Sequence, residues 1–185
     1  MKLIKIDSTI PRDIRYKTTN NFTGTIVYGP LAECYLIDAA AQAIAQVHHE
    51  LKRQNLSLKI FDAYRPLSIQ KIFWKLVPDE RYVANPTVGS RHNRGCAIDV
   101  TLIDLQTRRE IDMGTDFDDF THKAHRNYKN LAPTVLTHRE LLERVMNRHN
   151  FEGWLNEWWH FDFMGWQNYP VSNQSFEELH TIKET

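Results

Sequence analysis

Two short segments far apart along the chain carry residue types that suit hydrolytic metal chemistry. Ser90–Asp99 contains His92 and Asp99, and Glu157–His160 ends in a further histidine. Imidazole nitrogens and a carboxylate oxygen are ligands that Zn²⁺ accepts, and three protein ligands leave a fourth tetrahedral position for water. A carboxylate outside the ligand set, such as that of Glu157, supplies the base that zinc-assisted hydrolysis needs. The two segments together therefore indicate a catalytic zinc site.

Each of these residues also has a simpler interpretation. Asp99 lies in the apolar run 97–100, where a buried carboxylate is costly unless it is paired, so an arginine partner would serve as well as a metal. His92 lies in the polar loop 89–95 and would be solvated there without a metal. One metal ion explains Asp99, His92 and His160 together, which favours the metal interpretation.

The remaining polar candidates lie outside the two segments. Arg65 follows a predicted strand, and its rigid fork of donors suits an oxyanion or a carboxylate, although a surface arginine is the alternative. The acidic run 112–119 suits a solvated loop, a calcium site or a recogniser of a substrate ammonium; it lacks EF-hand spacing, which disfavours calcium. The other histidines are interpreted as structural or surface residues: His48, His49, His122, His125, His138, His149 and His180.

Composition sets the background for these candidates. The chain has 185 residues, 42% of them hydrophobic, and we expect one domain spanning residues 1–185. Lys+Arg and Asp+Glu balance at 23 each, so no overall field favours nucleic acid or an anionic membrane. No stretch has the ~18 apolar residues of a membrane span, residues 1–7 lack the apolar core of a signal peptide, and Cys34 and Cys96 make no disulfide framework. We therefore expect a cytoplasmic protein without nucleic-acid or membrane partners; the sequence leaves its oligomeric state open.

Hydrophobic spacing predicts the elements that position Arg65. Apolar residues at three- and four-residue steps predict a helix over 35–54, and alternation with period two predicts a strand over 56–62. Pro66 ends the strand and holds Arg65 extended. A short helix is expected next, with one apolar face formed by Ile69, Ile72, Phe73 and Leu76.

The second half of the chain should supply the metal-binding strands. A strand over 96–103 places Asp99 on one face and Cys96 on the other, so Cys96 is interpreted as a packed small residue rather than a fourth ligand. Further predictions are a short strand over 110–113, a strand over 158–163, and a helix that a capping box at 137–140 opens and that ends near Asn150. Its buried stripe is predicted as Leu141, Leu142, Val145 and Met146. Because no regular βαβ alternation occurs, we predict a single α+β domain with a central, mainly antiparallel sheet flanked by helices.

Glu157 presents a conflict within this scheme. Period-two alternation places His160 and Asp162 on one face of the last strand and Glu157 on the other. Glu157 can approach His160 if it lies just before the strand, after flexible residues 153–156. If it lies inside the strand, it is instead a cross-strand ion-pair partner.

The motif Ser90-x-His92-x-x-Gly95-x-Ala97-x-Asp99 followed by Glu157-x-x-His160 resembles the zinc signature of the D-Ala-D-Ala metallopeptidases. That group includes lysostaphin-like endopeptidases and the hedgehog signalling fold. The resemblance is closer to the VanX-type D-alanyl-D-alanine dipeptidases, and it extends from about Tyr16 to His160. The segments that carry this closer resemblance are 21–24, 62–66, 97–102 and 157–160.

The resemblance implies a role for each candidate. It implies an α+β fold with a central antiparallel sheet and one Zn²⁺ per chain, with Glu157 as the base and Arg65 as the transition-state stabiliser. Cys96 stands where a small Ser or Thr is expected. The implied zinc ligands are His92, Asp99 and His160, and the implied substrate contacts are Tyr16, Ser90 and Asp118.

The implied reaction is zinc-dependent hydrolysis of the dipeptide D-Ala-D-Ala to two D-alanines. The first alternative is a D,D-carboxypeptidase or peptidoglycan endopeptidase, for which we expect an export signal or a wall-binding module. The second is a non-catalytic, zinc-stabilised binding domain, for which we expect loss of the base or the arginine, yet Glu157 and Arg65 are both present. The dipeptidase is therefore the favoured prediction.

Overall fold

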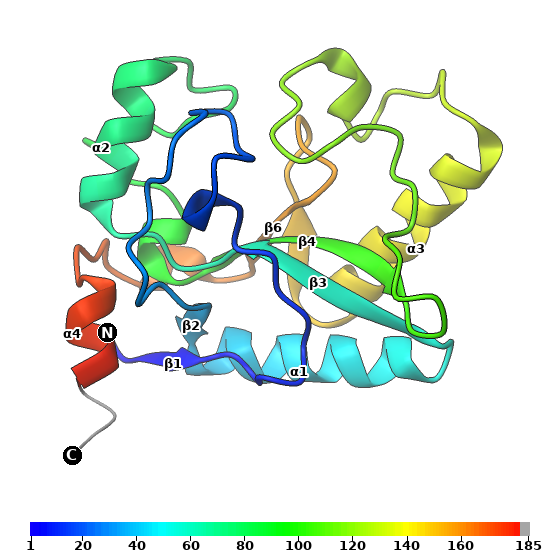
Figure 1. Ribbon diagram of the computed structural model, residues 1–185, viewed down its shortest axis with the longest axis horizontal. Helices are drawn as coiled ribbons and strands as arrows, with labels where there is room; N and C mark the ends of the chain where they lie inside the picture. The colour runs from blue at the N-terminus through cyan, green and yellow to red at the C-terminus, as the bar shows by residue number, and fades with distance from the viewer. Residues whose placement is uncertain (182–185) are drawn as a thin grey trace.

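The centre of the molecule is an antiparallel sheet with the strand order β3-β4-β6-β5 (Figure 1). The computed structural model describes residues 1–181. The sheet consists of β3 Leu56–Asp62, β4 Ala97–Asp104, β5 Phe151–Gly153 and β6 His160–Phe163. A separate two-stranded antiparallel sheet pairs β1 Leu3–Lys5 with β2 Tyr35–Ile37. The predicted α+β class with a mainly antiparallel central sheet is confirmed.

Helices flank this sheet. In Figure 1, α1 runs beneath β3 and β4, whereas α2 lies on the other side of them; α1 packs against β3 and α3 against β5. Among the described residues, no helix has both the length and the apolar character needed to span a membrane. The α-helices are α1 Asp38–Lys52, α2 Leu67–Leu76, α3 Pro133–Arg148 and α4 Phe176–Thr181. The 3-10 helices are η1 Arg15–Lys17, η2 His92–Arg94, η3 His122–Ala124 and η4 Trp166–Asn168.

Strand β4 is enclosed on both faces. It pairs with β3 on one edge and with β6 on the other, and every residue from Ala97 to Ile103 is buried. The predicted alternation therefore separates two interior environments rather than a core face and a solvent face. On one side lie apolar residues of the hydrophobic core, such as Ile98 and Val100, and on the other lies the polar side chain of Asp99.

The predicted helix over 35–54 was wrong at its first residues. Tyr35–Ile37 forms β2, and the helix begins only at Asp38. The Ile37 N–H donates to the Gly95 carbonyl, and the Tyr35 carbonyl accepts from the Tyr64 N–H. These long-range backbone partners, together with the pairing to β1, stabilise an extended segment whose apolar spacing fits a helix equally well.

The helix after Pro66 is present, but its predicted apolar face was partly wrong. Phe73 is buried, whereas Ile72 and Leu76 are 43% and 55% exposed. Gln70 is fully buried instead, because its amide accepts a hydrogen bond from Arg65 and donates one to the Ala84 carbonyl. The polar contacts of Gln70 with Arg65 and Ala84 therefore set the rotation of α2.

Other boundaries in the second half also differ from prediction. Helix α3 begins at Pro133, one turn before the predicted capping box, and the Thr137 hydroxyl donates to the Pro133 carbonyl inside the helix. Proline suits a first helical position because its missing N–H would have no partner there. The strand predicted over 110–113 was wrong: Glu110 forms only an isolated bridge to Ile103. The last strand starts at His160 rather than at residue 158.

Gly95 is a position where the backbone requires glycine. Its φ is +62°, and an added Cβ would overlap Leu3 Cδ2 and lie 3.2 Å from the Ile37 nitrogen. We expect Gly95→Ala to lower the free energy of unfolding by about 2–4 kcal/mol, because left-handed strain adds to overpacking. Gly24→Ala is the matched control, since its φ is +64° and no heavy atom lies within 4 Å of the added Cβ; it should cost about 1–2 kcal/mol. Urea unfolding of both variants measures the difference, and equal losses would contradict the packing argument.

Candidate metal centre and active site

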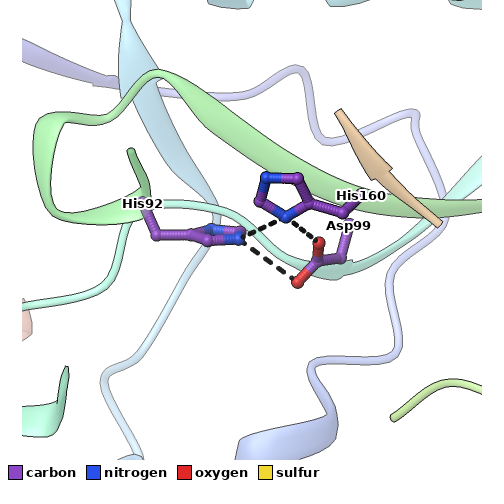
Figure 2. A group of neighbouring side chains, drawn as sticks. All are labelled: His92, Asp99 and His160. Atoms are coloured by element: carbon purple, nitrogen blue, oxygen red, sulfur yellow. Dashed lines mark hydrogen bonds and ion pairs between the residues drawn. The ribbon is translucent and has the colours of Figure 1, made fainter. Parts of the chain in front are cut away.

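Three of the predicted residues converge at the junction of β4, β6 and η2. Asp99 of β4 pairs directly with His160 of β6 in the antiparallel register, so their side chains project to the same side. His92 reaches them from η2. Candidate ligand atoms of the three residues lie within 4.8 Å of one another, and all three residues are buried (Figure 2).

The distances within this cluster show that the candidate ligand atoms of the three residues face one another. His92 Nε2 lies 3.2 Å from His160 Nδ1 and 3.4 Å from Asp99 Oδ2. His160 Nδ1 lies 3.0 Å from Asp99 Oδ1. Figure 2 shows one ring nitrogen of each histidine facing the carboxylate, while the other ring nitrogen points away.

The outward nitrogens have their own partners, and these fix which nitrogen is available to a metal. His92 Nδ1 lies 2.6 Å from the Ala63 carbonyl, to which it must donate. His160 Nε2 lies 3.0 Å from Asp162 Oδ1. When the outer nitrogen carries the proton, the inner one has a free lone pair, which is the usual arrangement around a metal-binding histidine. Two imidazole nitrogens and a carboxylate oxygen therefore fit Zn²⁺.

The electrostatics of the cluster favour a cation. Burial alone raises the pKa of Asp99, but the adjacent His92 and His160 outweigh it and hold that pKa well below its ordinary value. Burial likewise lowers the pKa of His160, but Asp162 and Asp99 outweigh it and raise that pKa to about 10. The negative field that favours a proton on His160 would equally favour a divalent cation at the same place.

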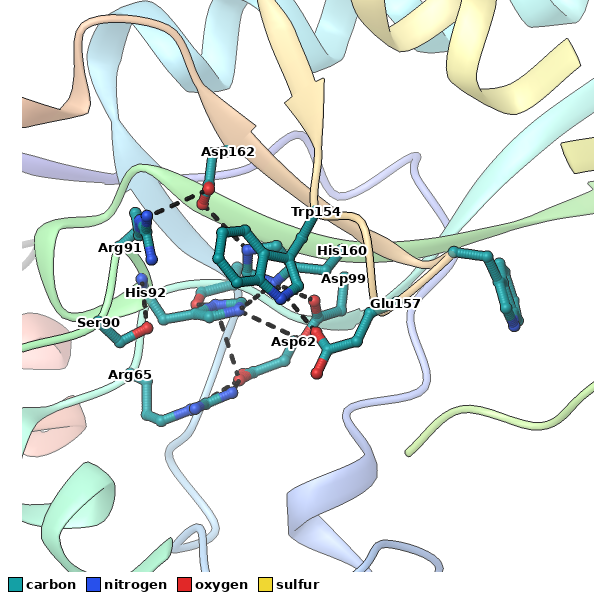
Figure 3. Close-up of polar contacts among 12 residues, drawn as sticks. Asp62, Arg65, Ser90, Arg91, His92, Asp99, Trp154, Glu157, His160 and Asp162 are labelled. Carbon is teal, nitrogen blue, oxygen red and sulfur yellow. Dashed lines mark hydrogen bonds and ion pairs between the residues drawn. The ribbon is translucent and has the colours of Figure 1, made fainter. Parts of the chain in front are cut away.

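Glu157 lies just before β6, in the segment that connects β5 to β6. This position removes the conflict of faces, because period-two alternation applies only from His160 onward. Glu157 is buried, and its Oε2 lies 3.9 Å from His160 Nδ1 (Figure 3). Burial raises the pKa of Glu157 to about 8, with contributions from Asp99 and Asp118 in the same direction. A carboxylate with a pKa near neutrality can both accept and return a proton.

Arg65 is held at the end of β3 by buried partners. Its Nε and Nη2 donate to Asp62 Oδ2 at 3.1 and 2.7 Å, and its Nη1 donates to Gln70 Oε1 at 2.9 Å. Tyr28 donates to the other oxygen of Asp62. A guanidinium has five N–H donors, so within residues 1–181 these contacts leave one N–H on each terminal nitrogen for a ligand.

Tyr16 and Asp118 come from distant parts of the chain and meet at the cavity. The Tyr16 hydroxyl lies 3.2 Å from each carboxylate oxygen of Asp118, which also accepts from the Phe22 N–H. Asp118 has a φ of +62°, a strained conformation that such contacts must maintain. Burial raises the pKa of Asp118 to about 8, and Asp99 adds to the rise.

All the sequence-predicted site residues line one cavity. Ser90 is at its wall, where its hydroxyl accepts from the His92 N–H at 3.2 Å. Apolar walls are supplied by Phe22, Phe73, Phe120 and Trp159. The predicted residues along the cavity are Tyr16, Arg65, Ser90, His92, Asp99, Asp118, Glu157 and His160.

Cys96 and the other histidines lie outside the cluster. Cys96 donates to the Arg94 carbonyl, and burial raises the pKa of its thiol to about 12. Within residues 1–181, the group of side chains placed to hold a metal contains His92, Asp99 and His160. The prediction that Cys96 is a packed residue agrees with this geometry.

Three buried residues that orient the candidate side chains were not predicted from the sequence. Asp62 and Gln70 orient Arg65, and Asp162 orients His160. The role of Asp162 could have been predicted, because the alternation of the strand places it on the same face as His160. The burial of Gln70 could not, since the apolar stripe of its helix gives no reason to bury an amide.

Comparisons with known proteins extend along nearly the whole chain. D-alanyl-D-alanine dipeptidase from Escherichia coli (strain K12) is 36% identical over 164 residues, which cover 89% of this chain and 84% of that protein. The enzyme of the same name from Enterococcus faecalis (strain ATCC 700802 / V583) is 29% identical over 183 residues, covering 89% and 90%.

Among solved structures, the vancomycin resistance D,D-pentapeptidase VanY in complex with Zn(II) aligns with a TM-score of 0.45 and 14% identity, covering 89% of this chain and 88% of that one. The LdcB LD-carboxypeptidase aligns with a TM-score of 0.47 and 15% identity, covering 80% and 65%. The family model described as D-ala-D-ala dipeptidase matches residues 2–180. The chain therefore belongs to this family, Peptidase_M15.

Proposed function

We propose that the protein hydrolyses D-Ala-D-Ala to two D-alanines with one Zn²⁺ bound by His92, Asp99 and His160. The observation that carries this proposal is the buried carboxylate of Glu157 beside, but outside, the cluster of candidate ligands. Family membership and the names of the relatives support the substrate.

The proposed chemistry assigns one task to each polar group. Zinc, when bound, polarises the scissile carbonyl and lowers the pKa of the attacking water. Glu157 accepts the proton of that water and returns it to the leaving amine. Arg65, fixed by Asp62 and Gln70, directs its remaining N–H donors at the developing oxyanion; one such donor is commonly worth about 3–4 kcal/mol of barrier.

Asp118 and Tyr16 are proposed to bind the amino-terminal ammonium of the dipeptide, with Ser90 contacting the substrate beside His92. A free dipeptide always carries that ammonium, whereas a longer or acylated peptide presents a neutral amide. An amide offers Asp118 no cation, so the carboxyl would either take up a proton or lie desolvated without a partner, and the ion pair that favours the free dipeptide would be lost. This is the proposed basis for selecting dipeptides.

We further propose that residues 1–185 act as one catalytic domain located in the cytoplasm. The two cysteines support a reducing compartment, because Cys34 and Cys96 are both buried and unbonded to each other.

Substitution of Glu157 separates the role of the base from that of the zinc ligands. Wild-type protein should contain one Zn²⁺ per chain, and Glu157→Gln should retain it while kcat falls about 10²–10⁴-fold, because a base outside the ligand set contributes to rate but not to metal binding. Metal analysis and D-alanine release measure the two quantities. Loss of zinc in the variant would make Glu157 a ligand, and unchanged turnover would remove it from the mechanism.

Substrate selection is tested with an acetylated dipeptide. N-acetyl-D-Ala-D-Ala should have a kcat/KM at least about a thousandfold below that of D-Ala-D-Ala. Each factor of ten in kcat/KM corresponds to about 1.4 kcal/mol, so a loss of about 4 kcal/mol in binding the transition state gives this ratio. Asp118→Asn should reduce this ratio by weakening turnover of the free dipeptide. Comparable kcat/KM values in the wild-type protein would favour a carboxypeptidase acting on longer stems.

The buried carboxylate of Asp118 should reduce stability in a pH-dependent way. Its pKa is about 8 in the folded protein, against an ordinary value of 3.8, so folding favours the protonated form, and stability falls as the pH rises from about 4 to about 8. Tyr16, Asp99 and Arg65 are the charged or titratable neighbours that act on it. Asp118→Asn should therefore be more stable than wild type by several kcal/mol at pH 8, on the order of 4–5 kcal/mol for a rise of about four pKa units, with the difference disappearing toward pH 4. Denaturant unfolding at a series of pH values checks this; a difference that grows toward low pH would contradict it.

A further inference from the structure

Arg126 is a largely buried cation that contacts the segment carrying the proposed base. It lies in the turn after η3, and its side chain is 9% exposed. Its Nε donates to the Trp154 carbonyl at 2.9 Å, and its Nη2 donates to the carbonyls of Trp158 and His160 at 2.9 and 2.8 Å. We call residues 154–159, which connect β5 to β6, the base loop.

The backbone around Arg126 adds two contacts to the same loop. The Arg126 N–H donates to the Leu155 carbonyl at 2.9 Å, and the Trp158 N–H donates to the Ala124 carbonyl at 3.1 Å. The base loop is therefore attached to the 124–126 turn on both sides of Glu157, which lies between Leu155 and Trp158 in sequence.

Inside the base loop, few hydrogen bonds hold Glu157. Its N–H donates to the Trp154 carbonyl at 3.3 Å, and the Trp154 N–H donates to the His160 carbonyl at 3.1 Å. The Trp154 and His160 carbonyls that close these turns also accept from Arg126. Without the guanidinium, both turns would lose a charged donor, and the Trp158 carbonyl would lose its side-chain partner.

An aromatic ring, a carboxylate and a glycine surround the guanidinium of Arg126. Its Cζ lies 4.3 Å from the centre of the Phe161 ring, and Glu143 Oε2 lies 3.5 Å from its Nη1. An added Cβ at Gly153 would overlap Arg126 Cζ. A planar fork can donate to carbonyls in several directions at once, which an ammonium on a flexible stem cannot do with the same geometry.

We propose that Arg126 is a positioning residue that fixes the base loop, and thereby Glu157, relative to the metal ligands; the catalytic consequence rests on the proposed function. The position of His160 depends less on the hydrogen bonds of Arg126, because β6 pairs with both β4 and β5. Loss of Arg126 should therefore displace the base while leaving the ligands and the ammonium contacts of Asp118 in place. A displacement of about 1 Å can cost about 10²-fold in rate.

The test compares two arginine-to-lysine variants of the zinc-loaded protein. Arg126→Lys should lower kcat for D-Ala-D-Ala about 10–100-fold, leave KM within about threefold and retain one zinc per chain. Amide hydrogen exchange should accelerate in residues 154–159. Arg12→Lys is the matched control, because Arg12 also donates to backbone carbonyls, those of Ile6 and Asp7, and pairs with Glu33; its kcat should match the wild type.

A second variant covers the case in which Arg126→Lys does not fold. Gly153→Ala keeps the arginine but displaces its guanidinium, so it should give the same loss in kcat and the same faster exchange. Restored turnover of an Arg126→Ala variant by added guanidinium ion would also support the proposal.

The outcomes distinguish this inference from the proposed function. An active wild type with unchanged kcat and unchanged loop exchange in the Arg126 and Gly153 variants would overturn the positioning role. So would a loss confined to KM, or an equal loss of kcat in Arg12→Lys. The zinc-loaded wild type could fail to cleave D-Ala-D-Ala while Arg126→Lys still accelerates exchange of the base loop. This result would overturn the proposed function and support the role of Arg126 in fixing the loop.

Discussion

The pairing of β4 with β6 in one register is the constraint on which the site depends. It sets Asp99 directly opposite His160, and a shift of one residue would turn His160 to the other face of the strand. Because β4 is covered on both faces, the two polar groups are enclosed away from solvent. Buried charge of this kind must be balanced by partners or by a metal. The sheet thus creates both the proximity of the candidate ligands and the electrostatic need for a cation.

Three of the candidate side chains are oriented by a further polar group rather than by apolar packing alone. The Ala63 carbonyl fixes the ring of His92, Asp162 fixes that of His160, and Asp62 fixes Arg65. These contacts restrict the rotamers of the three side chains, as the preorganised site proposed above requires. The same contacts enclose carboxylates that a core built only for stability would omit. Function has therefore been placed in the interior at a cost in folding free energy.

The sequence predicted best where local pattern and long-range structure agree. The strand over 56–62, the approximate extent of β4 and the α+β class follow from alternation and apolar content. Prediction failed where residues distant in sequence determine the local structure. Tyr35–Ile37 is a strand because β1 pairs with it. The helix α2 turns Gln70 rather than Ile72 and Leu76 inward because Gln70 binds Arg65. The convergence of Glu157 with His160 depends on where β6 begins, and a periodic pattern locates an element boundary poorly. The spacing of the motifs thus identified the candidates, whereas tertiary contacts determine their arrangement.

The placement of the acidic groups suggests how metal and substrate complement each other in the proposed reaction. Asp99 and Glu157 lie beside the two histidines of the candidate metal centre, and Asp118 lies beside Tyr16. Burial raises the pKa of both Glu157 and Asp118 to about 8, which expresses the cost of ionising neighbouring carboxylates in a desolvated space. A divalent ion would offset the charges of Asp99 and Glu157, and a substrate ammonium would offset that of Asp118. Each of these two cations would also lower the pKa of the carboxyl group that faces the other, because all the groups share one cavity. Binding of the dipeptide and ionisation of Glu157 would therefore be coupled.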